Sequence, residues 1–496
     1  MSTMLPTAAE PRIATFASVS DGDEDAVEIR RARELFERQR AHRWTVAATT
    51  AEQRIARLEL LRSAIGAMRG ELAAAMKADF GKHPAEVEIT EIHPALDEVN
   101  HAIRNLKKWM RPRAVSTPLL LTGTRSELRY EPKGVVLILA PWNYPFGLMA
   151  APLIAAVAAG NCAILRPSEK VPHTAAVVRR LVERVFPADE VAVVGGGVPV
   201  ANALLELPFD HFFFTGSTAV GRKVMSAAAK HLASVTLELG GKSPVFIDET
   251  ADAADAARRL MWGKFVNAGQ TCIAPDYVLV HERREREFLD AARATIAEFY
   301  GATEEERRAS PDFCRIVDPA AHRRLSEMLA ASIAAGARVE IGGVVDAEER
   351  YIAPTVLSNV TRYSPAMEEE IFGPILPVLT YASLDDAMDV VRKGGKPLAM
   401  YLFCGSAANR ERILAGTTAG ATVVDNVLLH YANPHLPFGG VGESGQGSYH
   451  GEYGFRAFSH ERPVMRQRGK PLVELFYPPY ARRMRELASS LARRLE

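Results

Sequence analysis

Short apolar segments alternate with helix-length segments along much of the chain, and this alternation restricts the fold more than any other feature. From residue 134 the apolar runs are 135–139, 163–165, 191–194 and 212–214. Strands buried on both faces of a parallel sheet have such runs, and crossover helices join them. The pattern predicts an α/β fold with a doubly wound parallel sheet. Residues 51–80, with apolar side chains every three or four positions, predict an amphipathic helix that covers one face of a sheet.

A second series of apolar runs begins near Pro244 and contains 277–280, 352–357 and 400–403. It indicates a second α/β domain, which suits a chain of 496 residues. Two segments fit neither series: 117–130, which turns at 122–124, and the region after His460. We expect both to form strands that extend a sheet, in a position suited to contact between subunits.

Charge and cysteine content exclude several classes of function. The 60 basic residues balance the 60 acidic residues, so no overall field attracts nucleic acid or an anionic membrane, and the expected partners are small molecules. The four cysteines form no C-x-x-C pair, which argues against a structural metal and a disulfide framework and favours a reducing cytoplasm. The N-terminus shows no export signal, and residues 1–25 are interpreted as a flexible leader.

Two segments have features of membrane contact. Residues 146–165 are about as apolar as a membrane span, but Pro152 and Gly160 interrupt them, which predicts a buried helix, a turn and the start of a strand. The C-terminal segment 480–496 has apolar residues at helical spacing among arginines. We expect a helix docked on the protein surface, and the alternative is contact with a membrane surface.

Cys272 lies in a turn-forming segment of small residues, 267–275. A lone cysteine is usually a small buried hydrophobic residue, and Cys162, Cys314 and Cys404 are interpreted in that way. Two other segments distinguish Cys272. Glu238 ends the predicted strand 234–239 beside a glycine pair, and Asn143 follows the strand 135–139 at the edge where ligands of α/β sheets bind. Taken singly, these two residues could be a solvated charge and a turn residue.

A fourth segment, 214–222, is a glycine-rich turn from a strand into a helix, a geometry that suits a pyrophosphate. It lacks the G-x-G-x-x-G pattern and the lysine of a nucleotide-triphosphate loop, so alone it is a weak signal. Together, the order and spacing of the four segments between about residue 50 and residue 465 resemble the aldehyde dehydrogenase superfamily. Segments 166–169, 369–374 and 436–442 agree, and 449–451 and 458–460 are most similar to the class 3, fatty and coniferyl aldehyde dehydrogenase branch.

The resemblance implies that Cys272 is the nucleophile, Glu238 the general base and Asn143 the oxyanion donor, helped by the backbone amide of Cys272. The implied reaction oxidises an aldehyde to the acid through a thiohemiacetal and a thioester on Cys272, which water activated by Glu238 hydrolyses. Transfer of the thioester to coenzyme A is the acylating alternative, and the presence of Glu238 favours water.

The resemblance also implies NAD or NADP as cofactor. The implied cofactor residues are Trp142, Arg166, Glu169, Gly216, Ser217, Gly221, Leu239, Glu370 and Phe372. Glu169 favours NAD because a carboxylate repels a 2′-phosphate. Arg166 stands where the matching motif usually has lysine, and because its planar fork can pair with a phosphate, the preference stays open. Glu443 also departs from the branch, and we attach no function to it.

A hydrophobic or aromatic aldehyde is the expected substrate, since no arginine is placed for a substrate carboxylate. The residues expected around the tunnel are Tyr144, Trp262, Phe265, Leu428, Leu429 and Phe458, although core packing alone would also demand such residues. Two other classes stay open: a cysteine hydrolase, which would need a histidine partner, and a non-catalytic structural or binding protein that keeps this fold.

The predicted organisation follows from these assignments. A dinucleotide-binding domain comprises 26–116 and 131–239, and a catalytic domain comprises 240–430. A β element for oligomerisation, in an expected homodimer, comprises 117–130 and 431–475. A C-terminal helix occupies 476–496.

Overall fold

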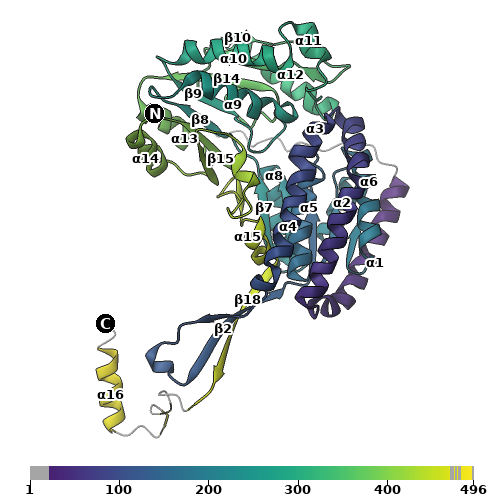
Figure 1. Cartoon of the computed structure of the whole chain (residues 1–496), viewed down its shortest axis with the longest axis vertical. Helices are drawn as coiled ribbons and strands as arrows, with labels where there is room; N and C mark the ends of the chain where they lie inside the picture. The colour runs from purple at the N-terminus through teal and green to yellow at the C-terminus, as the bar shows by residue number, and fades with distance from the viewer. Residues whose placement is uncertain (1–21, 470–473, 475–476, 479–481, 494–496) are drawn as a thin grey trace, which may run out of the picture.

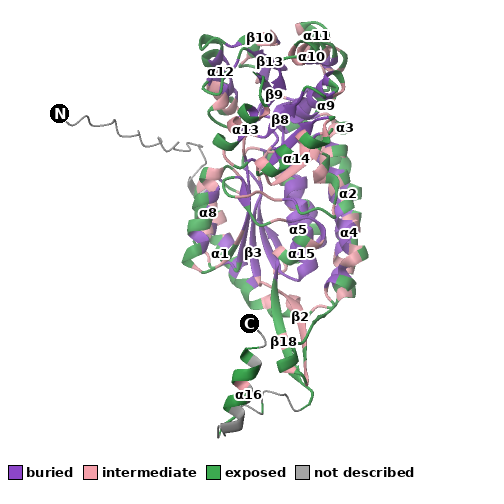
Figure 2. Cartoon of the chain, turned by 90° about the vertical axis from the view of Figure 1, so that its left-hand side faces the viewer, coloured by how far each residue is buried: buried purple, intermediate pink, exposed green. Residues whose placement is uncertain are grey.

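The computed structural model describes residues 22–469, 474, 477–478 and 482–493. Two α/β units lie one above the other, and a narrow β-ribbon projects from the lower unit (Figure 1). The strands of both large sheets are mostly buried, whereas the ribbon is largely exposed (Figure 2). Among the described residues, no helix combines the length and the apolar character needed to cross a membrane.

The lower unit is built on a six-stranded sheet with the order β17-β7-β6-β3-β4-β5. Five strands are parallel, and β17 is antiparallel to β7. The strands are β3 (Val135–Leu139), β4 (Cys162–Arg166), β5 (Val191–Val193), β6 (His211–Gly216), β7 (Ser234–Leu239) and β17 (Gly445–Gln446). The prediction of a doubly wound parallel sheet is therefore confirmed.

Helices cover both faces of this sheet, because its strands are apolar on both sides. The first face packs against α1 (Gly22–Ala47), α7 (Val198–Leu205) and α8 (Thr218–Lys230). The second packs against α2 (Ala51–Phe80), α4 (His93–Trp109), α5 (Gly147–Ala159) and α6 (Pro172–Val185). Helix α2 has the predicted bounds, with Thr50 in a capping box and Gly81 as its left-handed end.

The apolar run 146–165 forms the predicted buried helix, turn and strand. Every residue of α5 is buried, Gly160 adopts a φ of 89°, and β4 follows. Between α2 and α4 lie α3 (Pro84–Val87) and the π-helix η1 (Glu88–Ile92). Glu91 of η1 is fully buried, and it accepts hydrogen bonds from the backbone N–H groups of Phe146 and Gly147 at the start of α5. These contacts fix the segment that follows β3.

The upper unit contains a seven-stranded sheet with the order β10-β13-β14-β9-β8-β15-β16. Only β10 is antiparallel to its neighbour. Its strands are β8 (Pro244–Ile247), β9 (Tyr277–His281), β10 (Arg338–Ile341), β13 (Thr355–Ser358), β14 (Ile375–Tyr381), β15 (Ala399–Phe403) and β16 (Ala421–Val424). The helices of this unit are α9 (Ala253–Phe265), α10 (Glu285–Tyr300), α11 (Glu304–Ala309), α12 (Pro319–Ala334), α13 (Leu384–Lys393) and α14 (Ala407–Gly416).

The apolar run 352–357 was expected to be one strand, and this prediction is wrong. Strand β12 (Tyr351–Ile352) pairs with β11 (Val345–Asp346) in a separate two-stranded sheet, and β13 begins only at Thr355. Pro354 lies between them, and because proline has no N–H to donate, it interrupts a strand at this point.

The β-ribbon consists of β1 (Arg113–Val115), β2 (Thr124–Pro132) and β18 (Ser459–Gln467). Strand β2 is antiparallel to both neighbours, and its register with β18 runs from Pro132 opposite Ser459 to Thr124 opposite Gln467. The predicted turn is present, with a φ of 95° at Gly123 after the short 3-10 helix η2 (Leu119–Leu121). The predicted strands are present and form a three-stranded sheet of their own within this chain, and the expectation that they extend a sheet across a subunit interface stays a prediction.

Both ends of the chain differ from their predicted description. Helix α1 begins at Gly22, and Asp25 is buried and accepts a hydrogen bond from Gly197 N, so 22–25 do not belong to a flexible leader. The rest of that segment, 1–21, lies outside the described residues. Helix α16 (Arg482–Ala492) is present as predicted, but it lies away from both large sheets and is not docked on them (Figures 1 and 2). The boundaries proposed for the dinucleotide-binding domain, the catalytic domain and the β element stay a prediction.

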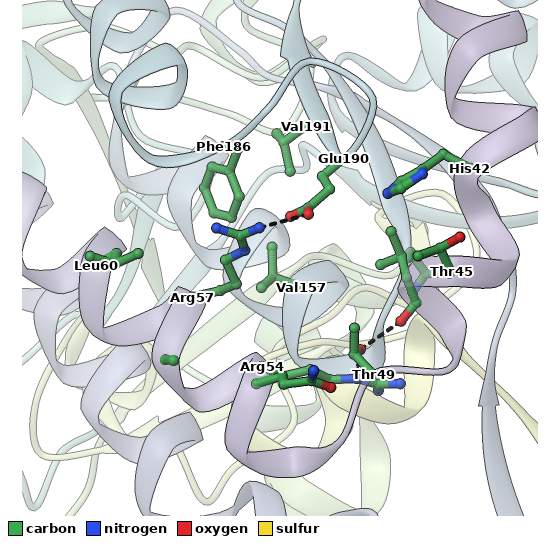
Figure 3. A pocket seen from close by; sticks show the side chains of 14 residues that line it. His42, Thr45, Thr49, Arg54, Arg57, Leu60, Val157, Phe186, Glu190 and Val191 are labelled. Carbon is green, nitrogen blue, oxygen red and sulfur yellow. Dashed lines mark hydrogen bonds and ion pairs between the residues drawn. The ribbon is translucent and has the colours of Figure 1, made fainter.

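A cavity of about 370 Å³ lies where α1 and α2 meet the starts of β4 and β5 (Figure 3). Arg57 pairs with Glu190 at 2.7 Å beside it. Arg54 donates to the carbonyls of Ala158 and Ala159 at the end of α5, and so ties α2 to that helix. This cavity is at the amino ends of the strands, whereas ligands of such sheets bind at the carboxyl ends.

Candidate active site

A cavity of about 350 Å³ contains Cys272 in its wall, together with residues of both units. Its lining is mainly apolar and aromatic, and includes Leu148, Trp262, Val266, Ile273 and Phe438. No lysine or arginine lines it. The exposed part of the lining includes the large hydrophobic residues Ile89, Trp262 and Leu429, together with the His93–Asp97 pair.

The loop before Cys272 is held in a constrained conformation. Asn267, Ala268 and Gly269, in the 3-10 helix η3 (Val266–Gly269), have φ values of 55°, 50° and 74°. A side chain at Gly269 would bring its Cβ to 2.3 Å from the carbonyl oxygen of Gly373, so only glycine fits there. Gln270 fastens the loop to the neighbouring segment, because its amide donates to Arg315 O and accepts from Val317 N. The thiol of Cys272 is thus presented to the cavity from a fixed backbone.

The environment of Cys272 opposes ionisation. Burial raises the pKa of its thiol to about 12, and the carboxylates of Glu370 and Glu238 contribute to the increase. Because the thiolate is the nucleophile, this site needs a base or a compensating positive charge before Cys272 can attack. The same contributions show that both carboxylates lie close enough to influence the sulfur.

Asn143 lies in the segment after β3 and is 2% exposed. Its Nδ2 donates to the carbonyl of Gln270 at 2.9 Å, and Asn267 Nδ2 donates to the Asn143 carbonyl at the same distance. These bonds join the segment after β3 to the Cys272 loop. A primary amide has two N–H groups and the bond to Gln270 uses one, so a second N–H donor of Asn143 remains available in the segment that is joined to the Cys272 loop.

Glu238 is the second-last residue of β7. It is paired with Thr215 of β6 on one side and with Gly445 of β17 on the other. It is 2% exposed, and neither carboxylate oxygen has a hydrogen-bond partner among the described residues. Burial raises its pKa well above the usual range of a glutamate. A carboxyl group with this environment can accept a proton and hold it.

The structure brings together four of the six residues predicted around the tunnel. Tyr144, Trp262, Leu428 and Leu429 line the cavity. The Tyr144 hydroxyl is 2.6 Å from Thr271 Oγ1, and Lys82 Nζ lies 4.1 Å from the centre of its ring, so this side chain is fixed.

Phe265 and Phe458 were predicted to contact substrate, and neither lines the cavity. Phe265 ends α9 and packs edge-on against Tyr300 of α10, with ring centroids 6.3 Å apart. Phe458 follows α15 (Gly451–Ala457) and stacks on Phe213 of β6 at 5.7 Å. Both rings are buried in the core, which is the role that apolar residues have by default.

The glycine-rich turn connects β6 to the amino end of α8. Ser217 caps that helix by accepting from Val220 N, and Thr215 Oγ1 is buried without a partner among the described residues. At Gly221 a Cβ would lie 2.6 Å from Leu239, so the glycine allows α8 to approach β7 closely. A helix start with free N–H groups and an unpartnered hydroxyl suits a pyrophosphate.

Arg166 and Glu169 lie together at the end of β4. Their side chains form an ion pair at 2.7 Å, and Arg166 Nη2 also donates to Gly196 O. Arg166 Nε is buried and has no partner in the described part of the chain. The negative charge of Glu169 is therefore balanced by the arginine beside it.

The third group of predicted cofactor residues lies nearer to Cys272. Trp142 packs edge-on against Phe372 at 5.3 Å, and Phe372 has a φ of 51°. Glu370 lies so close to Gly240 that a Cβ there would be 1.9 Å from its carboxylate, and burial raises its pKa to about 8. Within the described parts of the chain, Glu370 Oε1 has no hydrogen-bond partner, and the same is true of Arg166 Nε and Thr215 Oγ1. A dinucleotide, with its phosphates and ribose hydroxyls, fits this set of polar atoms.

The sequence did not point to three residues near the site. Lys264 is fully buried in the last turn of α9, and its Nζ has no hydrogen-bond partner among the described residues. Burial lowers its pKa to about 8, and Glu370 and Asp276 are close enough to oppose this decrease. Glu98 and His450 line the cavity. A lysine within the apolar segment 260–266 was a visible signal. His450 lies in segment 449–451, which supported the family resemblance but assigned it no role, and Glu98 has no distinctive local pattern.

Comparison with known proteins agrees with this geometry. A model of the aldehyde dehydrogenase family matches residues 6–464. The chain is 45% identical over 423 residues to 4,4'-diaponeurosporen-aldehyde dehydrogenase of Staphylococcus aureus, which covers 85% of this chain and 91% of that protein. It is 41% identical over 428 residues to aldehyde dehydrogenase family 3 member A2 of Mus musculus, with 86% and 87% covered. The solved substrate-bound state of Staphylococcus aureus AldH has a TM-score of 0.88 and 42% identity, and covers 92% of this chain and 99% of that chain.

Proposed function

The chain belongs to the aldehyde dehydrogenase family and is an NAD(P)-dependent oxidoreductase that acts on aldehydes, and on this premise we propose its mechanism and its class of substrate. One observation carries the mechanism. Cys272 lies in the wall of an apolar cavity, and Asn143 Nδ2 donates a hydrogen bond to the carbonyl of Gln270, two residues before Cys272. Glu238 is close enough to raise the pKa of the thiol.

In the first step Cys272 loses its proton and its sulfur attacks the aldehyde carbon. Because burial keeps the thiol protonated, Glu238 accepts this proton through a water molecule. The new C–S bond places a negative charge on the former carbonyl oxygen. The free N–H of Asn143 and the backbone N–H of Cys272 donate to this oxygen and stabilise the thiohemiacetal.

The cofactor is held by residues at the carboxyl ends of the strands. Gly216, Ser217 and Gly221 would hold the pyrophosphate at the start of α8, and Arg166 with Glu169 would hold the adenosine ribose. Trp142, Leu239, Glu370 and Phe372 would surround the nicotinamide half. When bound, the nicotinamide accepts the hydride that leaves the thiohemiacetal carbon.

Loss of that hydride leaves a thioester on Cys272, which water must hydrolyse. Before this step Glu238 passes the proton that it took from Cys272 to solvent. Glu238 then removes a proton from the attacking water, the C–S bond breaks, the departing sulfur takes a proton back, and the carboxylic acid and the thiol of Cys272 are released. Glu238 has no hydrogen bond to break before it acts. One buried carboxyl group thus serves both proton transfers at different times.

The substrate we propose is a hydrophobic or aromatic aldehyde. The cavity is lined mainly by apolar and aromatic residues, and its described lining contains no lysine or arginine to bind a carboxylate. The relative from Staphylococcus aureus that is 45% identical is a 4,4'-diaponeurosporen-aldehyde dehydrogenase, so this part of the family includes an enzyme named for an aldehyde of that kind. For the cofactor we propose a modest preference for NAD, because Glu169 opposes a 2′-phosphate while its ion pair with Arg166 weakens the repulsion.

We also propose that the protein is a homodimer. The ribbon of β1, β2 and β18 projects from the body of the molecule (Figure 1), and an exposed strand edge can pair with a second chain. A monomer mass from light scattering at micromolar concentration would overturn this part of the proposal.

The function is tested by following reduction of NAD and NADP with hexanal, benzaldehyde, cinnamaldehyde and succinic semialdehyde. We expect turnover of the three apolar aldehydes and little of the anionic one. Cys272→Ala should abolish turnover while still binding NAD, which fluorescence quenching measures. Full activity of that variant would refute the covalent route, and no reduction of either cofactor by folded wild-type protein would refute the proposed function.

A further inference from the structure

Within the cavity, Glu98 of α4 and His450 form a buried polar patch, whereas His93 and Asp97, which also line the cavity, are exposed and lie 3.2 Å apart. The side chains of Glu98 and His450 are each 6% exposed, and both line the cavity that contains Cys272. Their nearest polar atoms, Glu98 Oε2 and His450 Nδ1, are 3.6 Å apart. This separation is too long for a hydrogen bond, so the two groups do not satisfy each other.

The backbone around His450 holds this patch in place. His450 has a φ of 79°, a conformation that costs a residue with a side chain about 1–3 kcal/mol. Gly451 has a φ of 51°, and its N–H donates to Glu98 Oε1 at 2.7 Å. A Cβ at Gly451 would lie 2.3 Å from Pro434 O. The strained turn therefore fixes one oxygen of Glu98 and leaves the other towards the cavity.

The polar patch formed by Glu98 and His450 can make further hydrogen bonds. His450 Nε2 is buried and has no partner among the described residues. The rings of Tyr431 and Tyr449 pack against the imidazole, with centroids 4.7 and 4.4 Å away. Burial raises the pKa of Glu98 to about 7 and lowers that of His450 to about 3, so the imidazole is neutral. Buried polar groups without partners are costly, which makes a ligand group a physical explanation for them.

We propose that Glu98 and His450 form a subsite for a hydroxyl group of the substrate, so that the preferred substrate is an apolar aldehyde carrying a second, uncharged oxygen function away from the carbonyl. This inference rests on the proposed function. A hydroxyl has one donor and two lone pairs, which match an acceptor in Glu98 Oε2 and a neutral imidazole next to it.

Charged groups match the patch less well. A carboxylate would face Glu98 and the neighbouring Asp97, which also lines the cavity, without any lysine or arginine in the lining. An ammonium group carries three N–H donors, more than Glu98 Oε2 and one imidazole nitrogen can accept, and its transfer into an apolar cavity is expensive. Asp97 is exposed and already lies 3.2 Å from His93, so it does not complete a cation site in the buried patch.

The test compares matched aldehydes that differ in one oxygen atom. 4-(Hydroxymethyl)benzaldehyde and 4-ethylbenzaldehyde form one pair, and the corresponding cinnamaldehydes form a longer pair. In wild-type protein we expect a kcat/KM that is about 10- to 100-fold higher for the hydroxyl member of at least one pair, through KM, as one hydrogen bond to a buried charged or polar group provides. Glu98→Leu should remove this preference and leave kcat for the ethyl compound within about threefold.

Two further variants keep the result interpretable. Glu98→Gln retains an acceptor for Gly451 N and should keep part of the preference, even if Glu98→Leu does not fold. Glu452→Gln is the matched control, since Glu452 is a glutamate of α15 that pairs with Arg456 and does not line the cavity. The control should keep the full wild-type ratio.

Three results would overturn the subsite. These are equal kcat/KM within both pairs for wild type, a preference that survives Glu98→Leu, and a stronger preference for 4-formyl-N,N,N-trimethylanilinium over 4-tert-butylbenzaldehyde. The last result would identify a cation site. Failure of the proposed function is distinguishable, because wild-type protein would then oxidise neither member of a pair.

Discussion

Replacement of Asn143 by alanine should separate the chemistry of the site from the stability of the fold. If the free N–H of Asn143 stabilises the oxyanion, its removal should lower kcat by about 10²- to 10³-fold, as the loss of one oxyanion donor does in other enzymes. In free energy this is about 3–4 kcal/mol of transition-state stabilisation. KM should change little, because the oxyanion forms only after substrate has bound.

The cost to stability should be much smaller, because the structure contains a second donor. Asn143 Nδ2 donates to Gln270 O at 2.9 Å, and Asn267 Nδ2 donates to the same oxygen at 3.0 Å. That carbonyl therefore keeps a partner in Asn143→Ala, and the loss is one neutral hydrogen bond, about 1 kcal/mol. Asn267→Ala provides the contrast: it leaves Asn143 O without this donor and places alanine at a φ of 55°, at a combined cost of about 2–4 kcal/mol.

Steady-state kinetics with benzaldehyde and urea-induced unfolding of both variants measure these quantities. We expect Asn143→Ala to be almost inactive and nearly as stable as wild type, and Asn267→Ala to be clearly less stable. A folded Asn143→Ala protein with kcat within fivefold of wild type would refute the oxyanion role. A loss of stability as large as that of Asn267→Ala would show that Asn143 mainly anchors the Cys272 loop.

Three other predictions concern the proton, the thiol and the cofactor. Glu238→Gln should accumulate the acyl-enzyme because the water loses its base, and mass spectrometry without an adduct on Cys272 would contradict this role. In the free enzyme the pKa of Cys272 is raised to about 12, so alkylation by iodoacetamide should accelerate about tenfold per pH unit from pH 7 to 10; a plateau below pH 9 would show that the thiol is activated. Arg166→Lys should lower kcat/KM for NADP relative to NAD, since lysine lacks the planar fork, and an unchanged ratio would remove Arg166 from cofactor selection.

The sequence predicted the sheets well because their signal is local. The runs at 135–139 and 212–214 coincide with β3 and β6, since a strand buried on both faces needs an unbroken apolar segment. The predictions of element boundaries failed where a single residue, or a contact with a distant segment, determines where a strand or helix begins. Pro354 splits one apolar run into two strands, and the acceptor role of Asp25 towards Gly197 extends α1 into the expected leader.

The residues that we propose for catalysis were recognisable because each lies in a short motif of characteristic neighbours, whereas the lining of the cavity was not. Trp262 and Phe265 are equally apolar and belong to one helix, yet only Trp262 lines the cavity. The difference depends on the position of Tyr300 in another helix, which no local pattern contains. Glu98 and His450 are more than 300 residues apart in the chain, and only the packing of α4 against the turn at Gly451 brings them together.

Lys264 shows a further limit of local reasoning and bears on how Cys272 becomes reactive. Glu370 and Glu238 both contribute to the raised pKa of the thiol, and burial raises the pKa of both carboxyl groups as well. Lys264 is a buried amine close enough to Glu370 for the two charges to interact, and neither Lys264 Nζ nor Glu370 Oε1 has a hydrogen-bond partner among the described residues. A small displacement of Glu370 towards Lys264 would pair the two groups and weaken the repulsion that Cys272 experiences. The reactivity of the cysteine then depends on the arrangement of its charged neighbours as well as on its own loop.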